Sequence, residues 1–232
     1  PILRNGGAFF MRRSFGDNKL YSRVFYEHLR KLLQRGSSIE FFPEGGRSRS
    51  GRLLPPRPGI ISMLIRAFQD MDEKPVKFVP ISMNYEKVLE GNSYHKEAMG
   101  DAKKKESLTS ILRVARDFRG YLGDAYLQVG QPIDLKEFLD NNHESWSKNL
   151  ISEDLDNSPN QKWLYDLTPK LGKEIMKNIN KASVVTPSAL FASAILNANK
   201  FNLSEKKLKS RLSLYLNLIK LSDYSDQINI PE

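Results

Sequence analysis

The sequence predicts a mixed α/β fold, with a largely parallel sheet flanked by helices and a helical C-terminal region. Three observations support this prediction. Apolar runs of strand length alternate with helical stripes over residues 1–140. Residues 141–161 are rich in Asn, Ser and Asp and contain a proline, which is typical of a linker or a long surface loop. Only helical patterns follow, so we expect residues 162–232 to form a helical region.

Size and composition limit the chemistry that the chain can perform. The chain has 232 residues, enough for one large domain or a domain with a smaller appendage. It contains no cysteine, which excludes a disulfide, a thiolate nucleophile and a cysteine-ligated metal. We expect no signal peptide, and because the chain begins at Pro1 without a methionine we expect a fragment of a longer protein.

The positive charge is concentrated near the N-terminus. The net charge is +9, and residues 1–60 contain 12 Lys or Arg against 4 Asp or Glu, whereas the rest of the chain contains 24 and 23. Such asymmetry indicates an anionic partner: a phosphorylated small molecule, a coenzyme, an anionic lipid or a nucleic acid.

The first 42 residues predict a β–α–β unit, in which two short apolar runs flank an amphipathic helix. Asp17 or Asn18 is expected to cap the helix, and Gly36 to end it. The predicted elements are a strand at 8–11, a helix at 19–34 with an apolar stripe of Leu20, Val24, Leu29, Leu32 and Leu33 (Phe25 alongside), and a strand at 39–42.

Helices and strands continue beyond residue 58. Pro80 lies inside an apolar run and indicates an edge, a bulge or the end of that strand. Thr186 and Ser204 are expected to cap the last two helices, with Pro187 in the first turn of one of them. The predicted helices are 59–69, 107–118, 163–179, 187–198 and 205–221, and the predicted strands are 77–83 and 125–129.

The loop after residue 42 has the composition of an anion-binding site. Pro43 ends the preceding strand, because proline has no N–H to give to a sheet. Gly45 and Gly46 let the backbone approach a ligand closely. Arginines follow, and a guanidinium fork donates two parallel hydrogen bonds to a phosphate or carboxylate. A basic surface loop has the same composition, so the loop alone leaves both interpretations open. The arginines are Arg47, Arg49, Arg52 and Arg57.

Three sequence blocks, in this order, resemble the glycerol-3-phosphate O-acyltransferase family, which includes the bacterial membrane-associated enzyme and the related dihydroxyacetone-phosphate acyltransferase. They are GGAFFMRRSFG at 6–16, FFPEGGRSRSGRLLPP at 41–56 and FVPISMNYEKVLEG at 78–91. Weaker similarity continues after residue 140, including INKASVVTPSALFASAIL at 179–196. The resemblance implies a glycerolipid acyltransferase-like fold, with residues 1–140 as the C-terminal part of the acyltransferase domain.

The resemblance implies substrate-binding residues in each block. The arginines of the first two blocks would bind the acceptor phosphate, and the glutamate and glycine of the second would shape the acceptor pocket. The third block would line the acyl or acceptor pocket. Simpler roles stay open, such as a solvated arginine pair in the first block or a glutamate that accepts backbone N–H bonds in the second. The implied residues are Phe10, Arg12, Arg13, Glu44, Gly45, Arg47, Ser48, Arg49, Val79, Pro80 and Ile81.

The catalytic element of the family, a His and an Asp separated by four residues, does not occur in this sequence. None of the three histidines, His28, His95 and His143, has an Asp five places on. In the family this pair precedes the block that resembles residues 6–16. We therefore expect the pair upstream of Pro1 and assign no catalytic residue within this numbering.

The resemblance implies transfer of a fatty acyl group from an acyl thioester to the sn-1 hydroxyl of glycerol 3-phosphate, the first step of phospholipid biosynthesis. The missing His would be the general base and its Asp would orient it. No cofactor or metal is expected, and acyl-CoA or acyl carrier protein would bring the acyl group as a co-substrate. We expect peripheral association with the cytoplasmic face of a membrane. Dihydroxyacetone phosphate is an alternative acceptor.

Two functions of other classes stay open. A nucleic-acid-binding module would also explain the basic N-terminal part, but the arginines follow two strand ends and do not line a helix or an aromatic platform, so we expect no nucleic acid. A non-catalytic lipid- or membrane-associated relative would keep the fold without the His–Asp pair. Helix 205–221 suits either an anionic lipid surface or packing with a solvated basic face, through Lys206, Lys207, Lys209 and Arg211.

Overall fold

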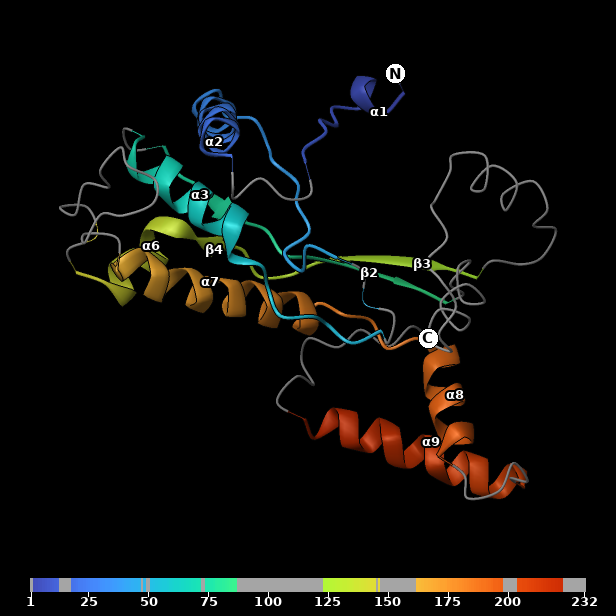
Figure 1. Ribbon diagram of the computed structural model, residues 1–232. Coiled ribbons are helices and arrows are strands. Elements are labelled where there is room, and N and C mark those ends of the chain that lie inside the picture. The colour runs from blue at the N-terminus through green and yellow to red at the C-terminus, as the bar shows by residue number, and fades with distance from the viewer. Residues whose placement is uncertain are drawn as a thin grey trace. The chain divides into compact units, whose positions relative to one another are not determined.

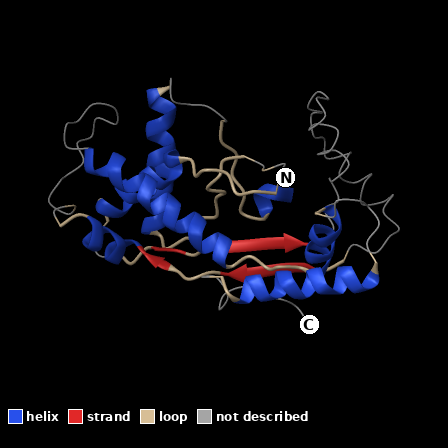
Figure 2. Cartoon of the chain, turned by 90° about the horizontal axis from the view of Figure 1, so that it is seen from below, coloured by secondary structure: helices blue, strands red, loops and turns tan. Residues whose placement is uncertain are grey.

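The computed structural model has a mixed α/β fold, as predicted (Figure 1). Its described part contains helices and two small two-stranded sheets, seen as red arrows in Figure 2. The chain divides into two compact units, Pro1–Pro43 with Arg57–Val76 and Asp134–Gly172, and Glu44–Pro56 with Lys77–Ile133 and Lys173–Glu232. The structure describes residues 2–12, 18–46, 48, 51–71, 74–86, 123–144, 146, 162–197 and 204–222.

The first unit is built from helices. They are α1 (Ile2–Asn5), α2 (Lys19–Gln34), α3 (Pro58–Gln69), α6 (Leu135–Asn142) and the N-terminal half of α7 (Lys162–Lys181). Their apolar faces form its core, whose fully buried side chains are Leu29, Ile61, Ile65, Leu135, Leu139, Leu164, Leu167 and Leu171.

Helix α2 has the predicted ends but a different buried face. Asn18 caps it by accepting a hydrogen bond from the Tyr21 N–H at 2.9 Å, and Gly36 follows its end with a φ of 75°. The predicted stripe is wrong at its start, because Leu20 is 76% and Val24 60% exposed. The helix instead buries a face of larger rings that packs against α3, namely Phe25 and Tyr26 together with Leu29.

A polar contact joins α2 to the end of α3. The Tyr26 hydroxyl donates a hydrogen bond to Asp70, the residue that follows α3. Burial raises the pKa of Tyr26, and the hydrogen bond to the Asp70 carboxylate raises it further. The Tyr26 phenol therefore stays neutral, and its hydroxyl has a hydrogen-bond partner at the edge of the core.

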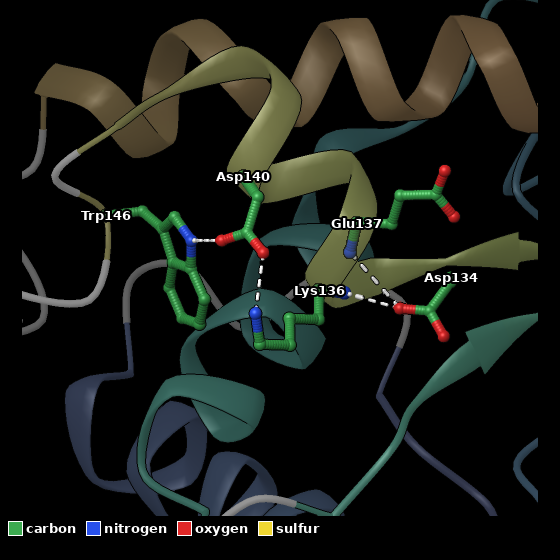
Figure 3. Close-up of polar contacts among 5 residues, drawn as sticks. All are labelled: Asp134, Lys136, Glu137, Asp140 and Trp146. Carbon is green, nitrogen blue, oxygen red and sulfur yellow. Dashed lines mark hydrogen bonds and ion pairs between the residues drawn. The ribbon is translucent and has the colours of Figure 1, made fainter.

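Helix α6 was not predicted, although its start signal is present in the sequence. Asp134 accepts hydrogen bonds from the N–H groups of Lys136 and Glu137, at 3.0 and 3.2 Å, and so caps the helix (Figure 3). An Asp followed three residues later by a Glu is the sequence pattern of a capping box, and it could have located α6.

Trp146, which follows α6, holds its segment of the chain against α3. Its Nε1–H donates to Asp140 at 2.7 Å, and Lys136 Nζ donates to the other carboxylate oxygen at 2.6 Å (Figure 3). Hydrogen bonds from Lys136 and then Trp146 hold the pKa of Asp140 below its usual value. The Trp146 ring stacks on Phe68 with centroids 5.6 Å apart, and its carbonyl accepts from Gln69 at 2.7 Å.

The second unit contains an antiparallel ribbon of β2 (Ile81–Tyr85) and β3 (Ala125–Val129), which pairs Ile81 with Val129 and Tyr85 with Ala125. One face of the ribbon is polar and turned inward. There Asn84 Oδ1 accepts from Ser82 Oγ and from the Val184 N–H, both at 3.1 Å. These bonds hold the segment that follows α7 against the ribbon.

The opposite face of the ribbon is apolar and half exposed, because side chains alternate between the two faces of a strand. We call it the outer face; each of its large side chains is 50–60% exposed. It consists of Ile81, Met83, Tyr85, Leu127 and Val129.

Pro80 breaks the predicted strand 77–83 in two. The first piece, β1 (Lys77–Phe78), pairs with β4 (Ile133–Asp134), and the second is the start of β2. A proline that ends a strand was one of the outcomes expected from the sequence, because proline cannot donate to the ladder. The strand predicted at 125–129 is confirmed as β3.

The strands predicted at 8–11 and 39–42 are wrong, since both segments are loop. Two of their four rings are largely solvated, with Phe10 65% and Phe42 79% exposed. An apolar run becomes a strand only when a second backbone pairs with it, and periodicity does not report the partner. The described strands do not show a largely parallel sheet, and the ribbon of β2 and β3 is antiparallel.

The C-terminal helices have the predicted caps. Thr186 Oγ1 accepts from the Ala189 N–H at the start of α8 (Pro187–Leu196), and Ser204 Oγ accepts from the Lys207 N–H at the start of α9 (Glu205–Lys220). Within the described ranges no helix is both long and apolar enough to cross a bilayer. The helix predicted at 107–118 lies outside the described residues.

Candidate functional site

The described part of the first predicted block, residues 6–12, contacts helix α2 through Phe9 and Arg12. Phe10 is 65% exposed and points away from the core, and Arg12 is also exposed. The guanidinium carbon of Arg12 lies 5.0 Å from the centre of the Tyr21 ring, a cation–π distance. The Arg12 N–H also donates to the Tyr21 hydroxyl at 3.1 Å. Arg13, the other arginine of the predicted pair, lies outside the described residues.

The described residues of the second predicted block form a loop in which a side chain bonds to the backbone of the same block. The Leu54 N–H donates to Glu44 Oε2 at 2.8 Å, so the carboxylate bridges two parts of the loop that are ten residues apart. Gly45 has a φ of 61°, a left-handed conformation that favours glycine. At the base, the Arg57 N–H donates to the Pro43 carbonyl at 2.7 Å. Glu44 and Gly45 therefore shape the loop, and the bond from Leu54 is the simpler role that the sequence left open for Glu44. Their role in an acceptor pocket stays a prediction.

Of the four arginines of this loop, the two that the family resemblance places at the phosphate, Arg47 and Arg49, lie outside the described residues. Ser48, between them, is half-buried. The anion-binding role of this block stays a prediction.

The three predicted site residues of the third block lie at the break between β1 and β2. Pro80 is buried, whereas Val79 and Ile81 on either side are each half exposed. The Pro80 carbonyl accepts from the Gly130 N–H at 2.8 Å. A Cβ on Gly130 would lie 2.8 Å from the Asn178 carbonyl oxygen of α7, so only glycine fits there without displacing backbone. Gly130 therefore helps to hold the backbone in place at Pro80, between the predicted residues Val79 and Ile81.

The predicted residues belong to two compact units. Phe10 and Arg12 lie in the first, and Glu44, Gly45, Ser48 and the Val79–Ile81 segment lie in the second. Convergence of the first-block and second-block arginines on one phosphate stays a prediction.

Two residues that contact predicted site residues were missed from the sequence: Tyr21, which contacts Arg12, and Gly130, which donates a hydrogen bond to Pro80. For Tyr21 the sequence gives the helix face on which it lies, but not its contact with Arg12. Tyr21, Phe25 and His28 are spaced i, i+4 and i+7 and therefore share one face of α2. The contact of Gly130 with Asn178 joins residues far apart in the chain and has no local signal.

Comparison with known protein families shows to which family this chain belongs. Residues 1–84 match the family described as Acyltransferase, and residues 94–232 match the glycerol-3-phosphate acyltransferase C-terminal region. The second match covers more than half of the chain. The chain belongs to the glycerol-3-phosphate acyltransferase family. The resemblance inferred from the three blocks is thereby confirmed.

Curated members of the glycerol-3-phosphate acyltransferase family match this chain along its whole length. The glycerol-3-phosphate acyltransferase of Pseudomonas putida (strain W619) is 39% identical over 231 residues, 100% of this chain and 27% of the relative. That of Shewanella halifaxensis (strain HAW-EB4) is 41% identical over 232 residues, 100% of this chain and 28% of the relative. The chain therefore spans little more than a quarter of the length of these relatives.

Proposed function

We propose that the protein containing this chain transfers a fatty acyl group from an acyl thioester to the sn-1 hydroxyl of glycerol 3-phosphate. The observation that carries the proposal is the match of the whole chain to relatives named glycerol-3-phosphate acyltransferase. The acceptor oxygen forms an ester bond with the acyl carbonyl carbon, the carbon–sulfur bond breaks, and the thiol leaves with the hydroxyl proton. The general base is a His outside this chain, by resemblance to the family.

The residues of this chain would supply position rather than proton transfer. Arg12, Arg13, Arg47 and Arg49 bind the phosphate in this proposal, and a fixed phosphate defines where the reacting hydroxyl lies. Orientation of this kind lowers an activation barrier by several kcal/mol, up to roughly 7–11 kcal/mol at the limit. In the described part of the same loop, the bond from the Leu54 N–H to Glu44 joins its two sides.

The test is an acyl-transfer assay on the full-length protein, with glycerol 3-phosphate and dihydroxyacetone phosphate in competition and with acyl-CoA and acyl carrier protein as separate donors. We expect 1-acylglycerol 3-phosphate as the main product. The position of the acyl group is read by mass spectrometry after selective hydrolysis.

Each other outcome identifies a competing function. A preference for dihydroxyacetone phosphate would assign the alternative acceptor. No product with either acceptor or donor, from a folded protein that still binds lipid, would assign a non-catalytic relative.

We further propose that the protein associates peripherally with the cytoplasmic face of a membrane, with α8 and α9 on the lipid surface. Helix α8 is apolar on all sides, yet Ala194 is its one buried residue, and such helices are usually covered by protein or lipid. Helix α9 packs on α8 through the bond from Arg211 to the Ala194 carbonyl at 3.1 Å. It buries none of its own residues.

Charge favours an anionic lipid as the surface that covers these helices. Helix α9 has five cationic side chains against one acidic side chain, Glu205. Its leucines Leu214 and Leu218 are 53% and 55% exposed and lie one turn apart. Exposed leucines beside lysines are typical of helices that lie in a bilayer interface. The cations are Lys206, Lys207, Lys209, Arg211 and Lys220.

Replacement of Leu214 and Leu218 by serine is expected to weaken binding of the 232-residue chain to phosphatidylglycerol-containing vesicles. The loss should be about tenfold, because each leucine buries part of its apolar area in the interface. Sedimentation with vesicles measures it, and pure phosphatidylcholine vesicles should bind weakly. The matched control is serine at Leu20 and Val24, which are exposed on α2. Equal loss in both variants, or equal binding to both vesicle types, would argue against this surface.

A further inference from the structure

Tyr21 contacts Arg12 at two separate points. The phenol oxygen accepts the Arg12 backbone N–H at 3.1 Å, and the aromatic ring lies 5.0 Å from the Arg12 guanidinium carbon. One side chain thus fixes both the backbone and the charged end of this arginine. Tyr21 is itself held in the first turn of α2, where its own N–H donates to Asn18 at 2.9 Å.

A second contact attaches the same loop to the same helix. The Phe9 ring meets His28 edge to face, with centroids 5.0 Å apart, and Phe25 at 6.1 Å. Tyr21, Phe25 and His28 stand on one face of α2, so they form a row that holds the loop at residues 9 and 12. Residues 8–12, the described part of this loop, pair with no strand, and the row supplies support there.

An arginine whose guanidinium lies over an aromatic ring can still donate hydrogen bonds from its N–H groups. The five N–H donors of a guanidinium lie in its plane, whereas a cation–π contact uses its charge above a ring. Arg12 can therefore keep its contact with Tyr21 while its N–H groups bind an anion. An unstacked, exposed arginine would sample many rotamers, and binding would have to restrict them. The contact with Tyr21 already restricts these rotamers before an anion binds, so binding costs less conformational entropy.

We propose that Tyr21 is a positioning residue that holds Arg12 in place for the acceptor phosphate. The inference rests on the proposed function, because Arg12 is taken there to bind glycerol 3-phosphate. Tyr21 touches neither substrate nor reacting atoms in this proposal. It acts through Arg12 and should affect the acceptor alone.

The test compares acceptor kinetics of full-length Tyr21→Leu and Tyr21→Phe variants. Tyr21→Leu removes the ring and the hydroxyl, so we expect the KM for glycerol 3-phosphate to rise about tenfold. Tyr21→Phe keeps the ring, and water can replace its hydroxyl at the exposed N–H, so we expect a rise of about two- to threefold. The KM for the acyl donor should stay within about twofold in both, since a purely structural loss would not spare one substrate. Tyr165→Leu, an exposed tyrosine of α7, is the control.

A double-mutant cycle separates this inference from the proposed function. If Tyr21 acts through Arg12, Tyr21→Leu should have no further effect on the acceptor KM in an Arg12→Ala background. Full additivity, or an equal rise in the KM of both substrates, would overturn the positioning role. If Arg12→Ala alone leaves the acceptor KM unchanged while activity persists, the assigned phosphate site is wrong. If Arg12→Ala raises that KM and Tyr21→Leu does not, only the role of Tyr21 is wrong.

Discussion

Replacement of Arg47 by alanine in the full-length protein is expected to lower kcat/KM for glycerol 3-phosphate by about 100-fold, since a guanidinium that binds a phosphate donates two charge-assisted hydrogen bonds. The effect should be confined to the acceptor, because the acyl thioester does not share this contact. Steady-state kinetics with each substrate varied in turn measures it. Arg47→Lys should recover part of the loss, since a lysine keeps the charge without the fork.

Arg57→Ala tests whether the effect is specific to Arg47, because Arg57 is an arginine of the same loop that the family resemblance does not place at the phosphate. Arg57 lies at the base of the same loop, its side chain is exposed, and its backbone N–H bond to Pro43 would survive the substitution. We expect its acceptor kinetics to stay within about twofold of the wild type. An Arg47→Ala enzyme with an unchanged acceptor KM and rate would remove Arg47 from the phosphate site.

Gly130→Ala is expected to lower the free energy of unfolding by about 1–3 kcal/mol, the usual cost of overpacking. The added Cβ would lie 2.8 Å from the Asn178 carbonyl oxygen, and 3.4 Å from both Ala182 Cβ and Pro80 Cβ. The nearest atom is backbone of α7, so a rotamer change cannot relieve the clash. Urea denaturation of the 232-residue chain, followed by circular dichroism, measures the loss.

Gly59→Ala tests whether this loss comes from the contact rather than from the loss of a glycine. Gly59 lies in the first turn of α3, and no atom lies within 4 Å of the position its Cβ would occupy. Alanine there should leave the free energy of unfolding unchanged or raise it by up to about 1 kcal/mol, because glycine is a poor helix residue. If both variants lose the same free energy of unfolding, the loss in Gly130→Ala does not come from close packing against Asn178.

The sequence predicted helix ends well because a cap is a local interaction. Asn18, Thr186 and Ser204 each accept a hydrogen bond from an N–H three residues on, so a few letters contain the whole signal. The break at Pro80 is equally local, since it follows from one missing N–H. The start of α6 at Asp134 obeys the same rule, since its capping signal is also contained in a few neighbouring residues.

Strands and buried faces were predicted less well because they depend on partners. Residues 8–11 and 39–42 have strand composition but lie in loops. The exposed Leu20 fits a helical stripe as well as the buried Leu29 does, and only packing against α3 distinguishes them. Hydrophobic periodicity finds an apolar residue but does not say what covers it.

The candidate site shows the same division. The three blocks and their order identified the family, because they depend only on residue types along the chain. The bond from Leu54 to Glu44 and the stacking of Arg12 on Tyr21 are tertiary, and no spacing rule gives them. Supporting residues such as Tyr21 are therefore found from coordinates, whereas the polar groups that contact substrate can be proposed from sequence.

The two faces of the β2–β3 ribbon should differ in how freely they accept mutation. On the inward face, Ser82 is buried and its hydroxyl lies 3.3 Å from that of Ser183, so neither a larger nor an apolar residue fits without loss of a hydrogen bond. On the outer face, half-exposed side chains such as Met83 and Leu127 have room for apolar residues of other shapes. In a saturation library across the ribbon, tolerance to substitution should therefore alternate from one residue to the next along each strand.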